Sequence, residues 1–485
     1  MEKVRIHFLP STYTETQKDY CDALKNANCF NEEFLFEVNY TNITENMQME
    51  LKKSNKKMKT DSTQSKDKFP LVPKKFLLPF ILLTSLFFAW GLANNMTDTL
   101  LAAFKKIMSM TDFQTSWIQI AFYFSYFCLA LPAAILIKKT TYKTGVIVGL
   151  LMFITGSLLF YPCSQTMVYG HFLIALYVLA GGLSVLETTA NPYIILMGPE
   201  ETATRRLNLA QSFNPIGSIM GVILSKFFIL SGLASYSAAE RAQMSAEELT
   251  GVQSQELNAV MGPYVGVAFI LILILILIVL TKMPKASDGD SSLNLGPTLK
   301  RLYANKKYFY GVIAQFFYVG AQISVWSFTI RYAMKELAIN EENASTYYIL
   351  SLTLFIGARF IFTGLMKYFS PGKLLLFAAI MASLCCGFTM ITHGYTGVIF
   401  LMFVSFFMSL MFPTIYGLTI TGLGEDTKIG GSGHIMAILG GAVITAFQGM
   451  VSDKTVVNYS YIIPLVCFLV VVAYSIYIEK KSINN

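Results

Sequence analysis

The amino-acid sequence predicts an all-α membrane protein, with about twelve transmembrane helices in two pseudo-symmetric six-helix bundles. Hydrophobic residues make up 54% of the 485 residues and charged residues only 14%. A soluble chain of this length would have about a quarter of its residues charged, so lipid must cover much of this surface. Apolar runs long enough to cross ~30 Å of hydrocarbon recur along the chain. Related motifs also stand at corresponding places in its two halves.

The chain begins with a polar segment, residues 1–75, which is strongly basic from Lys52 to Lys75 and lacks apolar periodicity. No apolar stretch in it precedes a small-residue cleavage site, so it does not have the form of a signal peptide. We expect a disordered, basic cytoplasmic tail. Met58 is an alternative start of translation, in which case residues 1–57 would not belong to the mature protein.

Twelve apolar runs follow this tail, and each predicts one transmembrane helix with a rise of 1.5 Å per residue. The first six predict an N-terminal bundle over 76–282 and the last six a C-terminal bundle over 308–485, joined by a cytoplasmic linker at 283–307. Gly, Pro and single polar residues interrupt several runs, as is typical of helices that line a cavity. The expected spans are 76–104, 113–137, 143–161, 167–197, 207–232, 262–282, 308–334, 345–369, 372–392, 395–423, 431–452 and 459–478.

The distribution of Lys and Arg predicts the orientation of these spans. With the N-terminus inside the cell, the cytoplasmic loops, the linker and the C-terminus hold most of the basic residues, for example Lys138, Lys139, Arg205 and Arg206. The loops of the opposite side hold few. The positive-inside rule therefore predicts that both termini are cytoplasmic and that the loop 233–261 faces outward.

A weak internal repeat supports the division into two bundles. The fourth run passes through Asn191–Tyr193 into a loop that begins at Gly198, and the tenth passes through Phe412–Tyr416 into a loop that begins at Gly424. Transporters with such repeats bind their substrate between the repeated units. We therefore expect a binding site between the two bundles.

Several other classes of function are unlikely on the same evidence. The net charge of +8 is spread over short clusters between apolar runs, so we expect no nucleic-acid partner. The seven cysteines show no CxxC or Cys/His metal spacing, so we expect no metal site. Nothing resembles a nucleotide-hydrolysing motif. We expect no cofactor, with a proton as the coupling ion.

Two carboxylates stand inside the apolar runs. Asp98 lies three and four residues after Asn95 and Asn94, on the same helix face, about seven residues or ~11 Å from the outer end of the first span. Acids within membrane spans usually line a pathway, which favours a functional role. The alternative is a hydrated side chain at the rim of the membrane.

Glu187 lies deeper, about ten residues or ~15 Å from the inner end of the fourth span. An ionised, unpaired carboxylate at this depth costs at least a few kcal/mol, so it must be protonated, paired or hydrated. A structural ion pair, for instance with Arg359, is the alternative to a functional role. The different depths of the two acids suit a carrier in which one handles substrate and the other a proton.

Polar side chains recur at three- and four-residue steps along three other spans. Amides and aromatic rings on one face suit a sugar, since hydroxyls need neutral donors and acceptors and the C–H faces of the ring stack on aromatics. Hydrogen bonds that hold the bundle together are the alternative for any single stripe. Among the four histidines, only His434, inside the eleventh span, is a candidate worth testing. The stripes are Gln119, Tyr123 and Tyr126; Asn208, Gln211, Asn214 and Ser218; and Gln315, Tyr318, Gln322 and Trp326.

Longer strings of residues carry a resemblance to a known family. Residues 76–478 resemble the L-fucose:proton symporter family of the major facilitator superfamily. The matching strings are Phe88–Asp98, Leu186–Pro192, Arg206–Asn214, Tyr318–Gln322 and Ile330–Tyr332. The resemblance implies the major facilitator fold, a multi-pass protein of the bacterial inner membrane, and a transporter rather than an enzyme. One departure is Phe412, where a fucose carrier is expected to have a tyrosine.

The resemblance also implies that Asp98 and Glu187 match two essential acids of the family, which serve proton coupling and sugar recognition. Asn95, Gln211 and Asn214 match polar positions of its sugar cavity. Together with the stripes and motifs, the predicted substrate-binding residues are Asn94, Asn95, Asp98, Gln119, Tyr123, Asn191, Gln211, Asn214, Tyr318, Gln322 and Trp326.

The sequence thus predicts a proton-coupled importer of L-fucose that works by alternating access in the plasma membrane. A glucose, galactose or other hexose carrier, coupled to protons or sodium, is an alternative within the same class. A membrane sugar receptor that does not transport is an alternative of another class. We expect a monomer whose partners are a monosaccharide and membrane lipid.

Overall fold

The computed structural model describes residues 69–107, 112–229, 234, 236, 238–284 and 294–484, and every regular element in these ranges is a helix. The predicted tail, residues 1–75, lies outside these ranges except for its last residues, which lead into a short 3-10 helix, η2 (Lys74–Phe76). The chain from Phe69 to Asn485 forms one compact unit. Eleven helices among the described residues are long and apolar enough to cross a membrane.

The first four expected spans are long helices. They are α3 (Leu77–Ile107), α4 (Asp112–Lys139), α5 (Tyr142–Thr166) and α6 (Tyr169–Leu196). α5 begins where the Thr141 side chain accepts a hydrogen bond from the Thr144 N–H, which satisfies one of the free donors at a helix start. Most residues of α6 are buried from its middle to its end.

The fifth expected span, 207–232, is interrupted, which explains why it is absent from the eleven. After η3 (Glu200–Thr202), it consists of α7 (Ala203–Gln211), α8 (Phe213–Leu224) and the π-helical turn η4 (Ser225–Ile229). The break falls at Ser212, whose hydroxyl donates to Asn208 O at 2.8 Å. Competition of serine hydroxyls for backbone carbonyls is a known cause of bends in helices.

The sixth span begins much earlier than expected. α9 (Ala238–Gln243) precedes α10 (Ala246–Leu280), so much of the expected loop 233–261 is helical. Ser245 and Glu248 form a reciprocal capping box at the start of α10, a signal that lies in the sequence but outside the apolar run. Nearby, Arg241 forms a buried ion pair with Glu256 at 2.5 Å.

The second half contains the remaining six spans. A short amphipathic helix, α11 (Leu295–Ala304), lies within the expected linker, and Arg301 at its end forms an ion pair with Asp426. The tenth span breaks after α15, and η7 interrupts the eleventh. The helices are α12 (Lys306–Leu337), α13 (Glu341–Leu365), α14 (Pro371–Ile391), α15 (Gly394–Met408), α16 (Met411–Ile420), η6 (Gly424–Asp426), α17 (Thr427–Met436), η7 (Ala437–Leu439), α18 (Gly440–Lys454), α19 (Val457–Ser460) and α20 (Ile462–Asn484).

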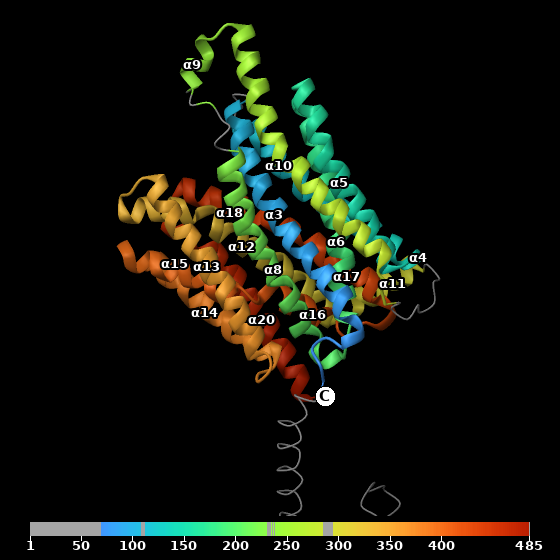
Figure 1. The fold of residues 1–485 in the computed structure, drawn as a ribbon. Helices are drawn as coiled ribbons and strands as arrows, with labels where there is room; N and C mark the ends of the chain where they lie inside the picture. The colour runs from blue at the N-terminus through green and yellow to red at the C-terminus, as the bar shows by residue number, and fades with distance from the viewer. Residues whose placement is uncertain are drawn as a thin grey trace, which may run out of the picture. The chain divides into compact units, whose positions relative to one another are not determined.

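Most close helix packing occurs within each half. α3 packs on α8, α5 on α6 and α10, and α4 on α6, whereas α14 packs on α15 and α20, and α12 on α18 and α20. Figure 1 shows the two groups, with α5 and α10 on one side and α13, α14 and α15 on the other. The main exceptions are α7, which lies against α16, and α17, which lies against α4 and α6. These helices join the halves.

Several helix ends and the start of the linker lie together on one side of the membrane region. Arg206, at the start of the fifth span, donates hydrogen bonds to Ile194 O and Ile195 O at the end of α6 and to Leu71 O before α3. Tyr193 donates to Pro284 O at the start of the linker. We call this the linker side.

Two glycines allow α3 and α8 to pack closely. A Cβ atom at Gly91 would overlap the backbone carbonyl of Asn214, and one at Gly217 would overlap that of Phe88. Small residues at such crossings are what permits close approach of transmembrane helices. This contact sets the distance of α8 from α3.

We predict that Gly217→Val separates α3 from α8 and destabilises the detergent-purified protein by about 1–3 kcal/mol or more, as overpacking does. Gly266→Val on α10 is the matched control, because a Cβ atom there would meet no atom within 4 Å. The measurement is thermal unfolding followed by size-exclusion chromatography. Equal melting temperatures of the two variants would contradict the close contact.

Candidate functional site

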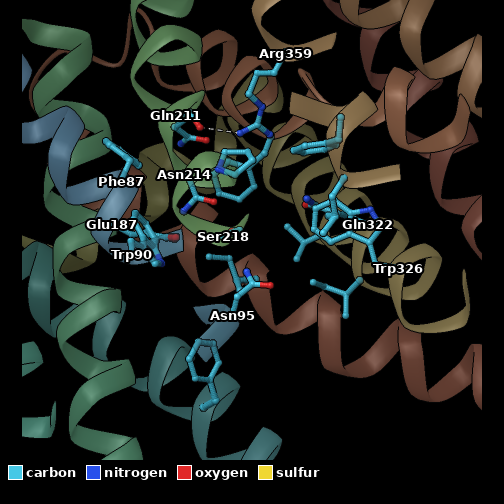
Figure 2. Close-up of a pocket in the computed structure, with 18 of the residues that line it drawn as sticks. Phe87, Trp90, Asn95, Glu187, Gln211, Asn214, Ser218, Gln322, Trp326 and Arg359 are labelled. Carbon is cyan, nitrogen blue, oxygen red and sulfur yellow. Dashed lines mark hydrogen bonds between the residues drawn. The ribbon is translucent and has the colours of Figure 1, made fainter. Parts of the chain in front are cut away.

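A cavity of about 250 Å³ lies between the two halves. From the first half, residues of α3, α4, α6, α7 and α8 line it, and from the second half residues of α12, α13, α16 and η7. Figure 2 shows Glu187 and Trp90 on one side and Gln322 and Trp326 across from them. The cavity therefore has the position that the internal repeat predicts.

The structure places the predicted residues as follows. Asn191 and Tyr318 are buried but do not line the cavity. Asn94, Asp98 and Gln119 lie on α3 and α4, and their side chains are outside what the structure describes. Those that line the cavity are Asn95, Tyr123, Glu187, Gln211, Asn214, Gln322 and Trp326.

Asn191 and Tyr318 have other partners, which explains their position. The Asn191 side-chain oxygen accepts a hydrogen bond from Gln211 Nε2 at 2.7 Å, so it fixes the orientation of a residue that does line the cavity. The Tyr318 hydroxyl donates to Met408 O at 2.9 Å near the break between α15 and α16. Carbonyl groups at helix ends need hydrogen-bond donors from outside their own helix. The predicted polar stripe on α12 thus extends beyond the cavity, and Tyr318 belongs to the packing of the bundle.

Glu187 reaches the cavity from the buried middle of α6, with only 8% of its surface exposed. Its Oε2 atom has no hydrogen-bond partner among the described residues. The ion pair with Arg359 that the sequence left open does not form. A carboxylate so placed is stable when it carries a proton or when water or a ligand supplies its hydrogen bonds.

Arg359, on α13, lines the cavity and was not among the predicted site residues. Its guanidinium donates to Ser409 O at 2.6 Å and to Gln211 O at 3.0 Å, and it lies 4.6 Å from the centre of the Phe355 ring. Ser409 and Gln211 belong to different halves, so Arg359 connects the two. The sequence did contain a signal for Arg359, because an arginine inside an apolar span is energetically costly and is kept where it has a role.

Further contacts join the halves toward the linker side. The Asn208 amide donates to the Thr414 hydroxyl at 3.2 Å, and Arg205 donates to Thr363 O at 3.3 Å. A Cβ atom at Gly417 would lie only 2.8 Å from the Thr204 hydroxyl oxygen, so α7 and α16 are in direct contact. These contacts close the linker side of the cavity.

Two tryptophans present aromatic surface to the cavity from opposite halves. Trp90 donates its indole N–H to the Tyr126 hydroxyl at 3.0 Å and stacks on Phe87. Trp326 donates to the Ser405 hydroxyl at 3.3 Å and packs edge-on against Phe355. Because each indole nitrogen has a partner in the bundle, the rings are held in fixed orientations.

The comparisons with known proteins agree with this architecture. The family model of the Major Facilitator Superfamily matches residues 80–445, about three quarters of the chain. Among curated proteins, the L-fucose-proton symporter of Haemophilus influenzae is 39% identical over 83% of this chain and 97% of its own length. That of Escherichia coli is 38% identical over 89% of this chain and its full length.

This chain belongs to the L-fucose:proton symporter family of the major facilitator superfamily. It is a multi-pass membrane transporter and not an enzyme. A glucose/galactose transporter of Brucella abortus is also similar, with 32% identity over 82% of this chain and 93% of its own length.

Solved structures of the family superpose on the chain. A crystal structure of the Escherichia coli fucose:proton symporter has a TM-score of 0.78 at 39% identity, covering 83% of this chain and 99% of that one. A structure of FucP in the outward conformation has a TM-score of 0.79 at 39% identity, covering 84% and 99%.

Proposed function

We propose that this chain imports L-fucose together with a proton by alternating access, with the cavity between its halves as the sugar site. The observation that carries the proposal is a small cavity that combines aromatic faces, side-chain amides and one buried carboxylate, that of Glu187, whose Oε2 atom has no hydrogen-bond partner among the described residues. Hydroxyl-rich ligands need neutral donors and acceptors, and their C–H faces pack on aromatic rings. The carboxylate supplies the site for a coupling ion.

The residues we assign to the sugar come from both halves. Asn95, Asn214 and Gln322 offer amides to hydroxyl groups, and Trp90 and Trp326 offer ring faces. Gln211, held by Asn191, lies at the end of the cavity beside Arg359. We retain Asn94, Asp98 and Gln119 in the site on the sequence argument. The chain would act as a monomer, because its own residues enclose the cavity.

The orientation follows from the basic loops. With both termini in the cytoplasm, the linker side faces the cytoplasm and the loop region around Arg241 faces outward. The cavity would then be closed toward the cytoplasm, so sugar and proton enter from outside. In bacteria this places the chain in the inner membrane.

The proposal predicts uptake of labelled L-fucose into proteoliposomes when a pH gradient, acidic outside, is imposed. Dissipating the gradient with a protonophore should remove accumulation, and an equal sodium gradient should not replace it. Unlabelled L-fucose should compete more strongly than D-galactose or D-glucose. Accumulation that followed sodium, or stronger competition by D-glucose or D-galactose, would favour the hexose carrier, and sugar binding without counterflow would favour the receptor.

We predict different transport defects for substitutions of the two carboxylates, Glu187 and Asp98. Glu187→Gln removes the titratable group while keeping its shape, so we expect loss of pH-driven accumulation with retention of fucose counterflow, in which no net proton movement is needed. Asp98→Asn should lower both accumulation and counterflow. Both rates are measured in the same proteoliposome preparation. Wild-type accumulation by Glu187→Gln would remove this residue from proton coupling.

The three tryptophans of the chain allow a direct test of sugar binding. Trp90 and Trp326 line the cavity, whereas Trp117 does not and is 46% exposed. We predict that L-fucose changes the intrinsic fluorescence of the purified protein and that Trp90→Phe and Trp326→Phe each reduce this change. Trp117→Phe is the matched control and should leave the fucose-dependent change intact. The reverse pattern would place the sugar elsewhere.

A further inference from the structure

A group of buried polar side chains lies between Glu187 and the linker side, beyond the cavity. Four of its members are Thr188, Tyr416, His434 and Tyr142, all at most 3% exposed. The hydroxyl oxygens of Thr188, Tyr416 and Tyr142 and both ring nitrogens of His434 have no hydrogen-bond partner among the described residues. Glu187 Oε2 is in the same condition.

The geometry brings these groups together from four helices. His434, on α17, packs between Tyr416 and Tyr308, with ring centroids 5.0 Å and 6.0 Å away. A Cβ atom at Gly431, one turn earlier, would lie 2.8 Å from the Tyr416 hydroxyl and 3.8 Å from Thr188 O. The Tyr416 hydroxyl therefore lies at the contact of α17 with α6, the helix that carries Glu187.

The titratable groups around Tyr416 and His434 come from every side of this contact. The titratable groups on the neighbouring helices are Glu187 on α6, Tyr142 on α5 and Tyr308 on α12. α4 contributes Tyr126, which is buried and whose hydroxyl accepts a hydrogen bond from Trp90. α17 also carries Lys428, whose Nζ atom lies 5.5 Å from the centre of the Tyr142 ring.

These groups lie at successive depths. Glu187 is nine residues, or ~13 Å, from the end of α6, and His434 is seven residues, or ~10 Å, from the start of α17. Tyr308 is the third residue of α12 and Tyr142 the first of α5. Tyr142 stacks on Tyr193 at 4.9 Å, and Tyr193 donates to Pro284 O at the linker. The series thus leads from Glu187 to the linker side.

Buried polar groups in proteins are nearly always satisfied, by protein or by ordered water. A histidine that serves only as packing commonly has at least one ring nitrogen bonded to a neighbour, because leaving a buried polar atom unsatisfied is costly. In this region at least six buried polar atoms have no hydrogen-bond partner among the described residues. Water that bridges them would satisfy all of them and form a continuous hydrogen-bonded chain.

We propose that Tyr416 and His434, through bridging water, carry the coupling proton between Glu187 and the linker side. This inference rests on the proposed proton coupling. The protonated Glu187 carboxyl passes its proton to a water, and the Tyr416 hydroxyl accepts a proton while it releases its own toward His434. The imidazole takes that proton on one ring nitrogen and releases the proton on the other, so one proton leaves Glu187 and one is delivered toward the linker side. Glu187 is then a carboxylate, Tyr416 is again a neutral hydroxyl, and His434 is neutral in its other tautomer.

The test compares His434→Phe and Tyr416→Phe with wild type in proteoliposomes. Both variants keep an aromatic ring and remove the groups that carry the proton. We expect pH-driven fucose accumulation, and the fucose-dependent proton influx reported by a trapped pH dye, to fall about tenfold or more, as the loss of a positioned proton carrier does. Fucose counterflow should stay close to wild type, because exchange needs no release of the proton. Tyr461→Phe is the matched control, since Tyr461 is equally buried but packs against Tyr332.

The outcomes are distinct. Wild-type accumulation in both variants would overturn the proposal, and so would a parallel fall of counterflow, accumulation and melting temperature, which marks a packing role. If His434→Phe alone lost counterflow, His434→Gln would decide, since it keeps polar atoms without an imidazole. Selective loss of proton influx in His434→Gln supports the proposal. Equal loss of proton influx and counterflow contradicts it. Absence of counterflow in the wild type would instead contradict the proposed function.

Discussion

The cost of a carboxylate in hydrocarbon is the constraint on which the rest of this structure depends. Glu187 lies in the buried middle of α6 and has no ion-pair partner in the described part of the chain. A lone ionised carboxylate at that depth is unfavourable by several kcal/mol, so its charge state must follow its surroundings. A cavity on one side of Glu187 and a group of buried hydroxyls and imidazole on the other provide those surroundings.

Two arrangements of the helices follow from this constraint. α7 and α17 pack against the other half as well as against their own, so both halves build the region between Glu187 and the linker side. Arg359 bonds to carbonyls of both halves, one of which belongs to Gln211 in the cavity wall. A ligand that changes the position of Gln211 would therefore act directly on a contact that holds the halves together, which is the differential interaction that alternating access requires.

The break at Ser212 has a similar consequence. It separates α7, which bonds to α16 through Asn208 and Thr414, from α8, which packs closely on α3 through Gly217. One expected span thus consists of α7, which is bonded to both halves, and α8, which packs on the first half. Gln211 and Asn214 stand on either side of the break, and both line the cavity. A change at the break can be transmitted to both halves, since α7 is bonded to both of them and α8 packs on α3.

The amino-acid sequence by itself determined the class of fold, the positions of nearly all spans and most of the cavity-lining polar residues. It could do so because the cost of polar groups in lipid leaves a strong one-dimensional signal, in apolar runs and in rare acids and amides. Only the tertiary structure decided four other features. They are the helical start of α10 at Ala246, the hydrogen-bond partners of Asn191 and Tyr318, the contacts of Arg359 with both halves, and the surroundings of His434. These depend on which faces of distant helices meet, and helical periodicity shows which side chains share a face without showing what that face contacts.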